Sequence, residues 1–127
     1  MARAGQAPVR ARLEALLSTG DLVLCAPTRL ELLIAAPAGA VAERAVDLAA
    51  YPSVPITEGT FARAEAVLAL LAPLGHHRAP SIADLVLAAA AEIAGLIVLH
   101  YDADIDLVAE VTGQPAEWVA PAGSLDR

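Results

Sequence analysis

The stretch from Ser81 to Asp106, SIADLVLAAAAEIAGLIVLHYDADID, constrains the fold of this 127-residue chain more than any other part of it. After Ser81, apolar residues recur at three-and-four spacing, which predicts a helix that begins at a serine N-cap and ends at Gly95. The apolar run at 96–99 then predicts a buried parallel strand. Ligand sites of open α/β sheets lie at the carboxyl ends of strands, so the aspartates that follow stand where chemistry is expected.

The remainder of the chain repeats this alternation of amphipathic helices and short apolar strands. At 127 residues it is predicted to form a single α/β domain with a parallel sheet, residues 1–127, in which residues 121–127 are a mobile tail. Helices are predicted over 8–18, 27–37, 39–50, 57–73 and 105–113, and further strands over 22–25, 54–57 and 117–119.

The composition excludes several classes of protein. A net charge of −7 with no lysine argues against a non-specific binder of polyanions, and 3% aromatic residues argue against a surface that stacks single-stranded bases. The single cysteine, Cys25, lies in an apolar run and is interpreted as a small core residue. The first residues lack the apolar core of a signal peptide, and no membrane span is predicted, so a cytoplasmic location is expected.

Four acidic residues are candidate metal ligands, each with a structural alternative. Glu31 lies in the apolar segment RLELL, where an acid is costly unless it pairs with Arg29 or another arginine, lies near the helix end, or binds a metal. Asp84 fits a capping box with Ser81, but it also precedes the apolar run whose companion strand ends in acids. Asp102 and Asp104 follow that strand directly, and either could instead cap the next helix.

Other chemistries fit the sequence less well. The D-x-D-x-D run at 102–106 is not a calcium loop, because its sixth and twelfth positions are Leu107 and Gly113 rather than Gly and Glu. No glycine-rich phosphate loop or activated nucleophile is present. The remaining candidates are given structural roles: a helix start for Asp106, a solvated loop for His76 and His77, and a packing anchor for Trp118.

Three segments of the chain resemble the PIN-domain ribonucleases, specifically the VapC-type toxins of VapBC toxin–antitoxin pairs. These segments are LVLCAPTRLELL, GHHRAPSIADLVLAAAAEIAGLIVLHYDADID and VTGQPAEWVAPAGSL. The resemblance implies a three-layer α/β/α fold with a short parallel sheet and an endoribonuclease that depends on Mg²⁺ or Mn²⁺. It also implies an RNA substrate, a cognate VapB-type antitoxin and a homodimer. Matched residue by residue, the family's catalytic, metal-binding acids fall on Glu31, Asp84 and Asp102, with Asp104 beside Asp102.

The sequence departs from the family pattern in two places. Nothing before Pro8 matches the family's first, central strand and the Asp of its V-D-x-S-like motif, so both are expected to be missing from an N-terminally truncated domain. His100 stands where many members carry Thr or Ser. A missing central strand would expose apolar surface and sheet edges, so the 127-residue form is expected to be poorly stable, to bind metal weakly and to cleave RNA slowly or not at all.

Two alternatives to an active nuclease follow from the same residues. The chain could be a non-catalytic remnant that still binds an antitoxin through its apolar helices. It could also be a small acidic helical protein without a site, which requires the four candidate acids to lie far apart.

Overall fold

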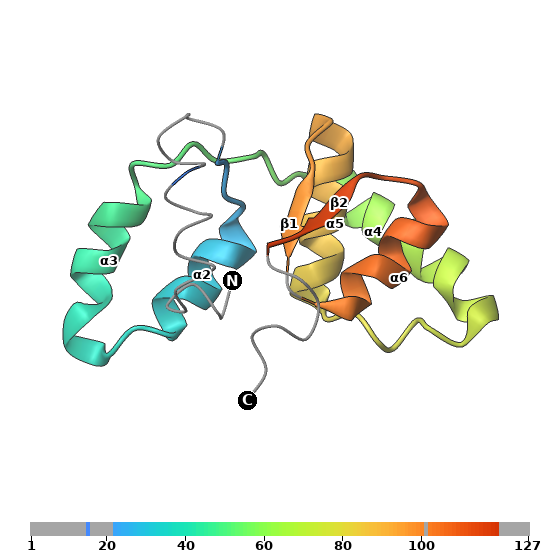
Figure 1. Ribbon diagram of the computed structural model, residues 1–127, viewed down its shortest axis with the longest axis horizontal. Coiled ribbons are helices and arrows are strands. Elements are labelled where there is room, and N and C mark those ends of the chain that lie inside the picture. Colours follow the sequence, from blue (N-terminus) through green and yellow to red (C-terminus); the bar gives the residue numbers. More distant parts are fainter. Residues whose placement is uncertain (1–14, 16–21, 101, 120–127) are drawn as a thin grey trace.

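The computed structural model describes residue 15, residues 22–100 and residues 102–119. Figure 1 shows α2 and α3 on one side of the molecule, and α4, α5 and α6 with a small sheet on the other. The predicted helix at 8–18 and the tail at 121–127 lie outside the described residues, apart from Ala15, which is helical. In chain order the elements are α2 (Ala26–Ile34), η1 (Ala38–Ala40), α3 (Val41–Leu48), α4 (Glu58–Leu71), η2 (Ala72–Leu74), α5 (Ile82–Ala94), β1 (Val98–His100), α6 (Ala103–Thr112) and β2 (Ala116–Trp118).

The described residues contain one regular sheet, in which β1 and β2 run parallel and α6 forms the crossover between them. Val98 pairs with Ala116, and His100 pairs with Trp118. A single parallel bridge elsewhere joins Leu24 to Ser53. The α/β class predicted from the sequence is therefore confirmed, with helices making up most of the structure.

Three strand predictions need correction. The strand predicted at 22–25 is reduced to the isolated bridge at Leu24. The strand predicted at 96–99 begins two residues later, because the backbone amide of Leu96 donates to the carbonyl of Ala91 and completes the end of α5. The segment 54–57 forms no strand. Pro55 has no amide to donate to a ladder, and Thr57 is already the N-cap of α4.

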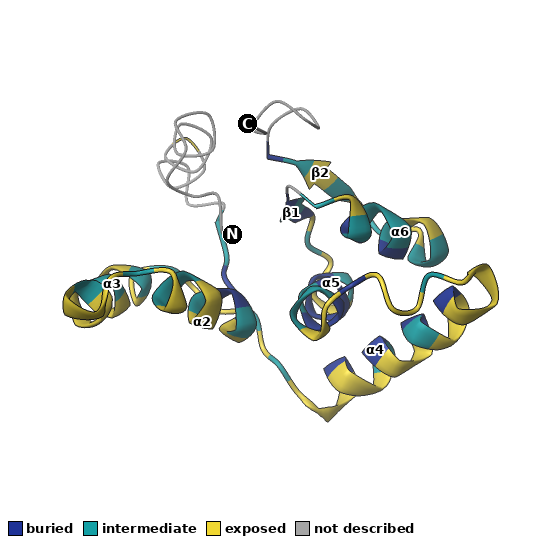
Figure 2. Cartoon of the chain, turned by 90° about the horizontal axis from the view of Figure 1, so that it is seen from below, coloured by how far each residue is buried: buried dark blue, intermediate teal, exposed yellow. Residues whose placement is uncertain are grey.

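Helix α5 occupies the centre of the core. Its buried face is largely alanine, and Ala88, Ala89 and Ala90 are each at most 2% exposed. Small side chains let α4 and α6 approach α5 closely, and Leu71 of α4 and Val108 of α6 fill the space between the helices. Figure 2 shows the buried residues concentrated on α5 and on the faces of its neighbours that point toward it.

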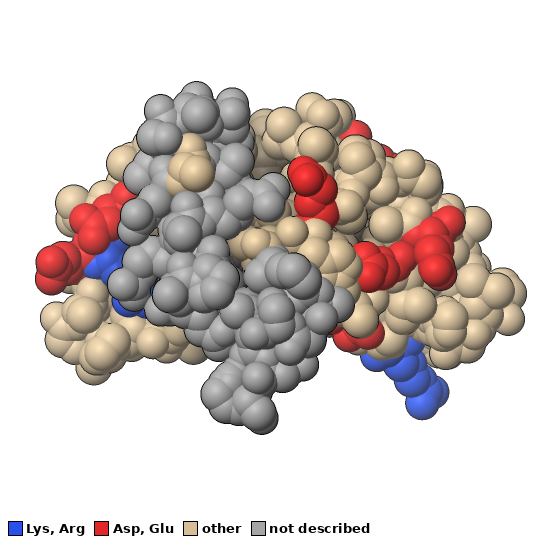
Figure 3. Space-filling view, viewed as in Figure 1, with Lys and Arg blue, Asp and Glu red and all other residues tan. Residues whose placement is uncertain are grey.

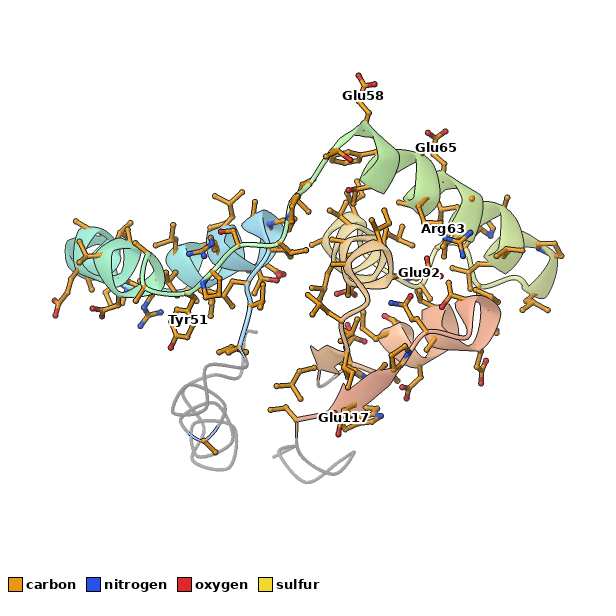
Figure 4. The ribbon with its side chains drawn as sticks, turned by 90° about the horizontal axis from the view of Figure 1, so that it is seen from above. Tyr51, Glu58, Arg63, Glu65, Glu92 and Glu117 are labelled. Atoms are coloured by element: carbon orange, nitrogen blue, oxygen red, sulfur yellow. The ribbon has the colours of Figure 1, made fainter. Side chains whose placement is uncertain are left out.

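A bidentate ion pair ties α4 to α5 at the edge of this core. Nε of Arg63 donates to Glu92 Oε1 at 2.6 Å, and a terminal nitrogen of Arg63 donates to Oε2 at 3.1 Å. Figure 4 shows the two side chains pointing toward one another between the helices, while Glu58 and Glu65 point outward from α4.

A second arginine connects α2 to the end of α3. The guanidinium of Arg29 donates to the backbone carbonyl of Leu48 at 2.5 Å, to that of Tyr51 at 2.6 Å and to Oγ of Ser53 at 2.9 Å. Leu48 is the last residue of α3, and the other two acceptors lie in the segment that follows it, so Arg29 fixes the end of α3 and this segment against α2. No bond between Arg29 and Glu31 is observed among the described residues, so the arginine that the sequence offers to Glu31 is engaged elsewhere.

None of the helices in the described part of the chain has the length and apolar character that crossing a bilayer requires.

Candidate metal centre

Three of the four predicted acids lie together. Asp84, Asp102 and Asp104 each place a carboxylate oxygen within 4.8 Å of the others, and all three side chains are half-buried. Asp84 belongs to the first turn of α5, whereas Asp102 and Asp104 follow the carboxyl end of β1. The acids thus converge at the sheet edge where the sequence pattern placed a ligand site.

Local hydrogen bonds fix the backbone that carries each of these acids. The hydroxyl of Ser81 accepts from the amide of Asp84 at 3.1 Å, which confirms Ser81 as the N-cap of α5. Asp102 is the N-cap of α6, and its Oδ1 accepts from the amide of Asp104 at 2.9 Å. Asp102 therefore has the capping role that the sequence left open between Asp102 and Asp104, and it keeps Oδ2 for other partners.

The electrostatics of the group show that the three acids disfavour being charged together. Burial, followed by the negative charge of Asp102 and a hydrogen bond to its side chain, raises the pKa of Asp84 to about 6. Burial and the charge of Asp102 also raise the pKa of Asp104. Both aspartates lie in first helical turns, where the helix dipole favours a carboxylate, so crowding outweighs the dipole here. A cation between the carboxylates would remove this repulsion.

Acidic side chains outnumber basic ones in this protein. Figure 3 shows acidic side chains at several places on the visible face and few basic ones, in keeping with the net charge of −7.

Glu31 is not part of the group of three. It is exposed on α2, and its carboxylate is absent from the set whose oxygens lie within 4.8 Å of one another. Helix α2 packs against α5, the helix that carries Asp84. The cost expected for an acid in an apolar helix does not arise, because the solvent hydrates this side chain.

His100, Asp106 and Trp118, which the sequence analysis did not include among the candidate ligands, form a contact network beside Asp102. His100 is buried, and its Nδ1 accepts a hydrogen bond from the amide of Asp102 at 3.2 Å. Asp106 accepts from Nε1 of Trp118 at 3.0 Å and also faces His100. The sequence did carry a signal for His100. The histidine lies two residues after Val98 and two before Asp102, and alternate residues of a strand share a face, so its side chain is expected beside the strand end that leads to Asp102.

The comparison with known protein families decides the identity of this fold. The family described as PIN domain matches residues 2–111, most of the chain. The chain belongs to the PIN domain family.

Individual relatives of this PIN domain are ribonucleases by name. Ribonuclease VapC18 of Mycobacterium tuberculosis is 42% identical over 125 residues, which cover 96% of this chain and 91% of that protein. Ribonuclease VapC51 of the same species is 48% identical over 81 residues, covering 64% of this chain and 58% of that protein. Ribonuclease VapC2 is 47% identical over 93 residues, covering 71% and 66%. The resemblance to VapC-type PIN domains is therefore confirmed.

The donor set of this PIN domain fits a hard divalent cation. Three aspartates supply oxygen ligands only, which suits Mg²⁺ or Mn²⁺ and does not favour softer metals that prefer sulfur or imidazole. The carboxyl groups of Asp84 and Asp102 are close enough to share a hydrogen bond, and below about pH 6, without a cation, Asp84 supplies the proton for it. This proton lies between the two carboxyl groups, where a bound cation would reduce their repulsion.

Proposed function

We propose that this PIN domain is a metal-dependent endoribonuclease and acts as the toxin of a type II toxin–antitoxin pair. The observation that carries the proposal is the convergence of Asp84, Asp102 and Asp104, whose carboxylate oxygens lie within 4.8 Å of one another at the end of β1. The relatives named Ribonuclease VapC support RNA as the substrate. Mg²⁺ or Mn²⁺ is the proposed cofactor.

The proposed reaction is hydrolysis of an RNA phosphodiester, in which water attacks phosphorus and the bond to the leaving oxygen breaks. A divalent cation, when bound, supplies Lewis-acid activation of the phosphodiester and of the attacking water. Asp84, Asp102 and Asp104 would hold that cation, and below about pH 6 Asp84 must first release its proton. The cation also offsets the repulsion between an acidic protein and the phosphates of RNA.

Glu31 is proposed as a fourth acidic residue of the loaded site. The family resemblance assigns it this role, and its position on a helix packed against α5 supports the assignment. Because the carboxylate is solvent-exposed and separate from the group of three, its side chain would have to turn toward the site or act through water.

Cleavage assays with matched variants test the proposal. Purified protein is incubated with a structured RNA in Mn²⁺, in Mg²⁺ and in EDTA. We expect cleavage that requires the cation and falls at least hundredfold in Asp84→Asn and in Asp102→Asn. Glu65→Gln, which removes an exposed acid that points away from α4, should cleave as the unaltered protein does. Cleavage that persists in EDTA, or that survives Asp84→Asn, contradicts the proposal.

A cognate VapB-type antitoxin and a second copy of the chain are the proposed protein partners, in a cytoplasmic setting where RNA is available. Exposed large apolar side chains support partner binding, because they would be covered in a complex. Ile34 of α2 is 82% exposed, Val46 of α3 is 73% exposed and Ile82 of α5 is 78% exposed. Light scattering tests the dimer, for which we expect twice the 13.0 kDa chain mass.

The second candidate function is the non-catalytic remnant that binds an antitoxin. The same exposed apolar residues favour it, and the cleavage assay separates it from the nuclease. An antitoxin complex that forms normally around a protein without cation-dependent cleavage would select this alternative.

A further inference from the structure

We propose that His100 is a positioning residue of the metal centre. Its imidazole holds the backbone amide of Asp102, and Asp106 and Trp118 hold the imidazole, so that the carboxylate of Asp102 faces those of Asp84 and Asp104. The inference rests on the function proposed above, since it assigns a role within that site.

The contacts of His100 define its tautomer. Nδ1 accepts from the amide of Asp102 at 3.2 Å, so Nδ1 carries no proton and the neutral ring is protonated at Nε2. Nε2 lies 3.4 Å from Oδ1 of Asp106 and has no hydrogen bond of regular geometry to any described residue. A buried N–H that faces a carboxylate at this distance gains electrostatic attraction, and this attraction favours the same ring orientation.

Two neighbouring elements fix the imidazole in that orientation. Trp118 lies opposite His100 in the β1–β2 register, and the ring centroids are 4.9 Å apart with planes inclined by 51°. Nε1 of Trp118 donates to Oδ2 of Asp106 at 3.0 Å. The carboxylate of Asp106 therefore lies between the tryptophan of β2 and the histidine of β1, and it is anchored in the first turn of α6.

The arrangement supports a positioning role and argues against acid–base chemistry at His100. Only 4% of the side chain is exposed, and its two nitrogens face Asp102 and Asp106, so the ring is not available to a substrate. Asp102 needs such support because it has two tasks. Its Oδ1 already caps α6 through the amide of Asp104, and the residue must still direct its other oxygen into the acidic group. Partners that orient metal ligands in this way typically change metal affinity by about 10–100-fold when they are removed.

Calorimetry of Mn²⁺ binding tests this role with two substitutions of His100, one that removes the hydrogen-bond acceptor and one that keeps it. His100→Leu keeps an apolar side chain in the space but removes the acceptor, and we expect Mn²⁺ to bind about tenfold more weakly. His100→Asn retains an acceptor at the position of Nδ1, and we expect it to recover most of the affinity. Val108→Ala serves as the matched control, since Val108 is buried on α6 and is not among the residues in this network. It should lower the melting temperature and leave Mn²⁺ affinity unchanged.

Spectroscopy of the metal-free protein provides a readout that needs neither metal nor RNA. Nitrogen-15 spectra of the imidazole should show the Nε2–H tautomer, and the amide of Asp102 should exchange with solvent faster in His100→Leu than in His100→Asn. If His100→Leu does not fold, Trp118→Phe takes its place. It keeps an aromatic ring beside His100, removes the donor to Asp106 and should weaken Mn²⁺ binding several-fold.

The outcomes separate this inference from the proposed function. Three outcomes would overturn the positioning role and leave the nuclease intact. They are an Mn²⁺ affinity of His100→Leu equal to that of the unaltered protein, an Nδ1–H tautomer of His100, and a loss of Mn²⁺ affinity in Val108→Ala equal to that in His100→Leu. Unchanged affinity in Trp118→Phe overturns the part assigned to Trp118 and Asp106. Failure of the unaltered protein to bind Mn²⁺ overturns the proposed function together with this inference.

Discussion

The carboxyl group of Asp84, in the first turn of α5, meets that of Asp102, which begins α6, and the two are close enough to hydrogen-bond. Each side chain is half-buried, and one carboxylate oxygen of Asp104 lies within 4.8 Å of an oxygen of each. Two carboxylates in such contact cannot both ionise without cost. Without a cation the site therefore holds a proton below about pH 6 and carries unfavourable negative charge above it, and this property affects both its stability and its metal binding.

The first prediction concerns stability against pH in the absence of divalent cations. The pKa of Asp84 is raised from 3.8 to about 6, so between these pH values the folded protein keeps a proton that the unfolded chain has released. Rising pH then favours unfolding, and the loss is complete once pH exceeds the folded pKa. We expect Asp84 to cost about 1–2 kcal/mol above pH 6, a figure reduced for the half-exposure of the group.

Urea unfolding at pH 4 and pH 7 in EDTA measures this effect. Asp84→Asn removes the titrating group and should be more stable than the unaltered protein at pH 7 but not at pH 4. Glu65→Gln controls for the loss of one surface charge. A stability difference between Asp84→Asn and the unaltered protein that does not change with pH would refute the assignment.

The second prediction concerns proton release on metal binding. Because Asp84 is protonated below about pH 6 and a cation needs its carboxylate, Mn²⁺ should displace a proton at pH 5 and almost none at pH 8. Calorimetry in two buffers of different ionisation enthalpy gives the number of protons released. Asp84→Asn should abolish most of the release at pH 5. Equal release at both pH values would place the coupled proton on another group.

The third prediction concerns the core between α4 and α5. Leu71 is fully buried there, whereas its neighbour Leu70 is 45% exposed. We expect Leu71→Ala to lower the free energy of unfolding by about 3 kcal/mol and Leu70→Ala to lower it by less than about 1 kcal/mol. Urea unfolding measures both. Similar costs for the two variants would mean that the packing of α4 differs from the structure.

The fourth prediction concerns the ion pair between α4 and α5. The bidentate contact of Arg63 with Glu92 is partly exposed, so solvent screens it and a modest contribution is expected. A double-mutant cycle with Arg63→Met and Glu92→Gln should give a coupling energy of about 0.5–1 kcal/mol. The coupling should shrink in 1 M salt. Additive effects of the two substitutions would indicate that the pair contributes nothing measurable.

The sequence predicted the helices well because their determinants are local. Ser81 and Gly95 bound α5 as expected, since an N-cap hydroxyl and a glycine in the left-handed region act within one turn of the helix ends. It predicted the strands less well. The amide of Leu96 completes the end of α5, and the strand begins only at Val98, the first residue that pairs with β2, which the apolar run 96–99 does not reveal.

The sequence by itself determined the α/β class, the approximate positions of α2 to α6 and the resemblance to PIN-domain ribonucleases, because periodicity, caps and motif spacing are properties of neighbouring residues. Only the tertiary structure decided which acids meet. It brought Asp84 to Asp102 and Asp104 while leaving Glu31 exposed on α2, and it placed Asp106 and Trp118 around His100. These distances depend on how α5, α6 and β2 pack around β1. Carboxylate repulsion and burial, which set the pKa of Asp84, therefore arise only in the folded chain.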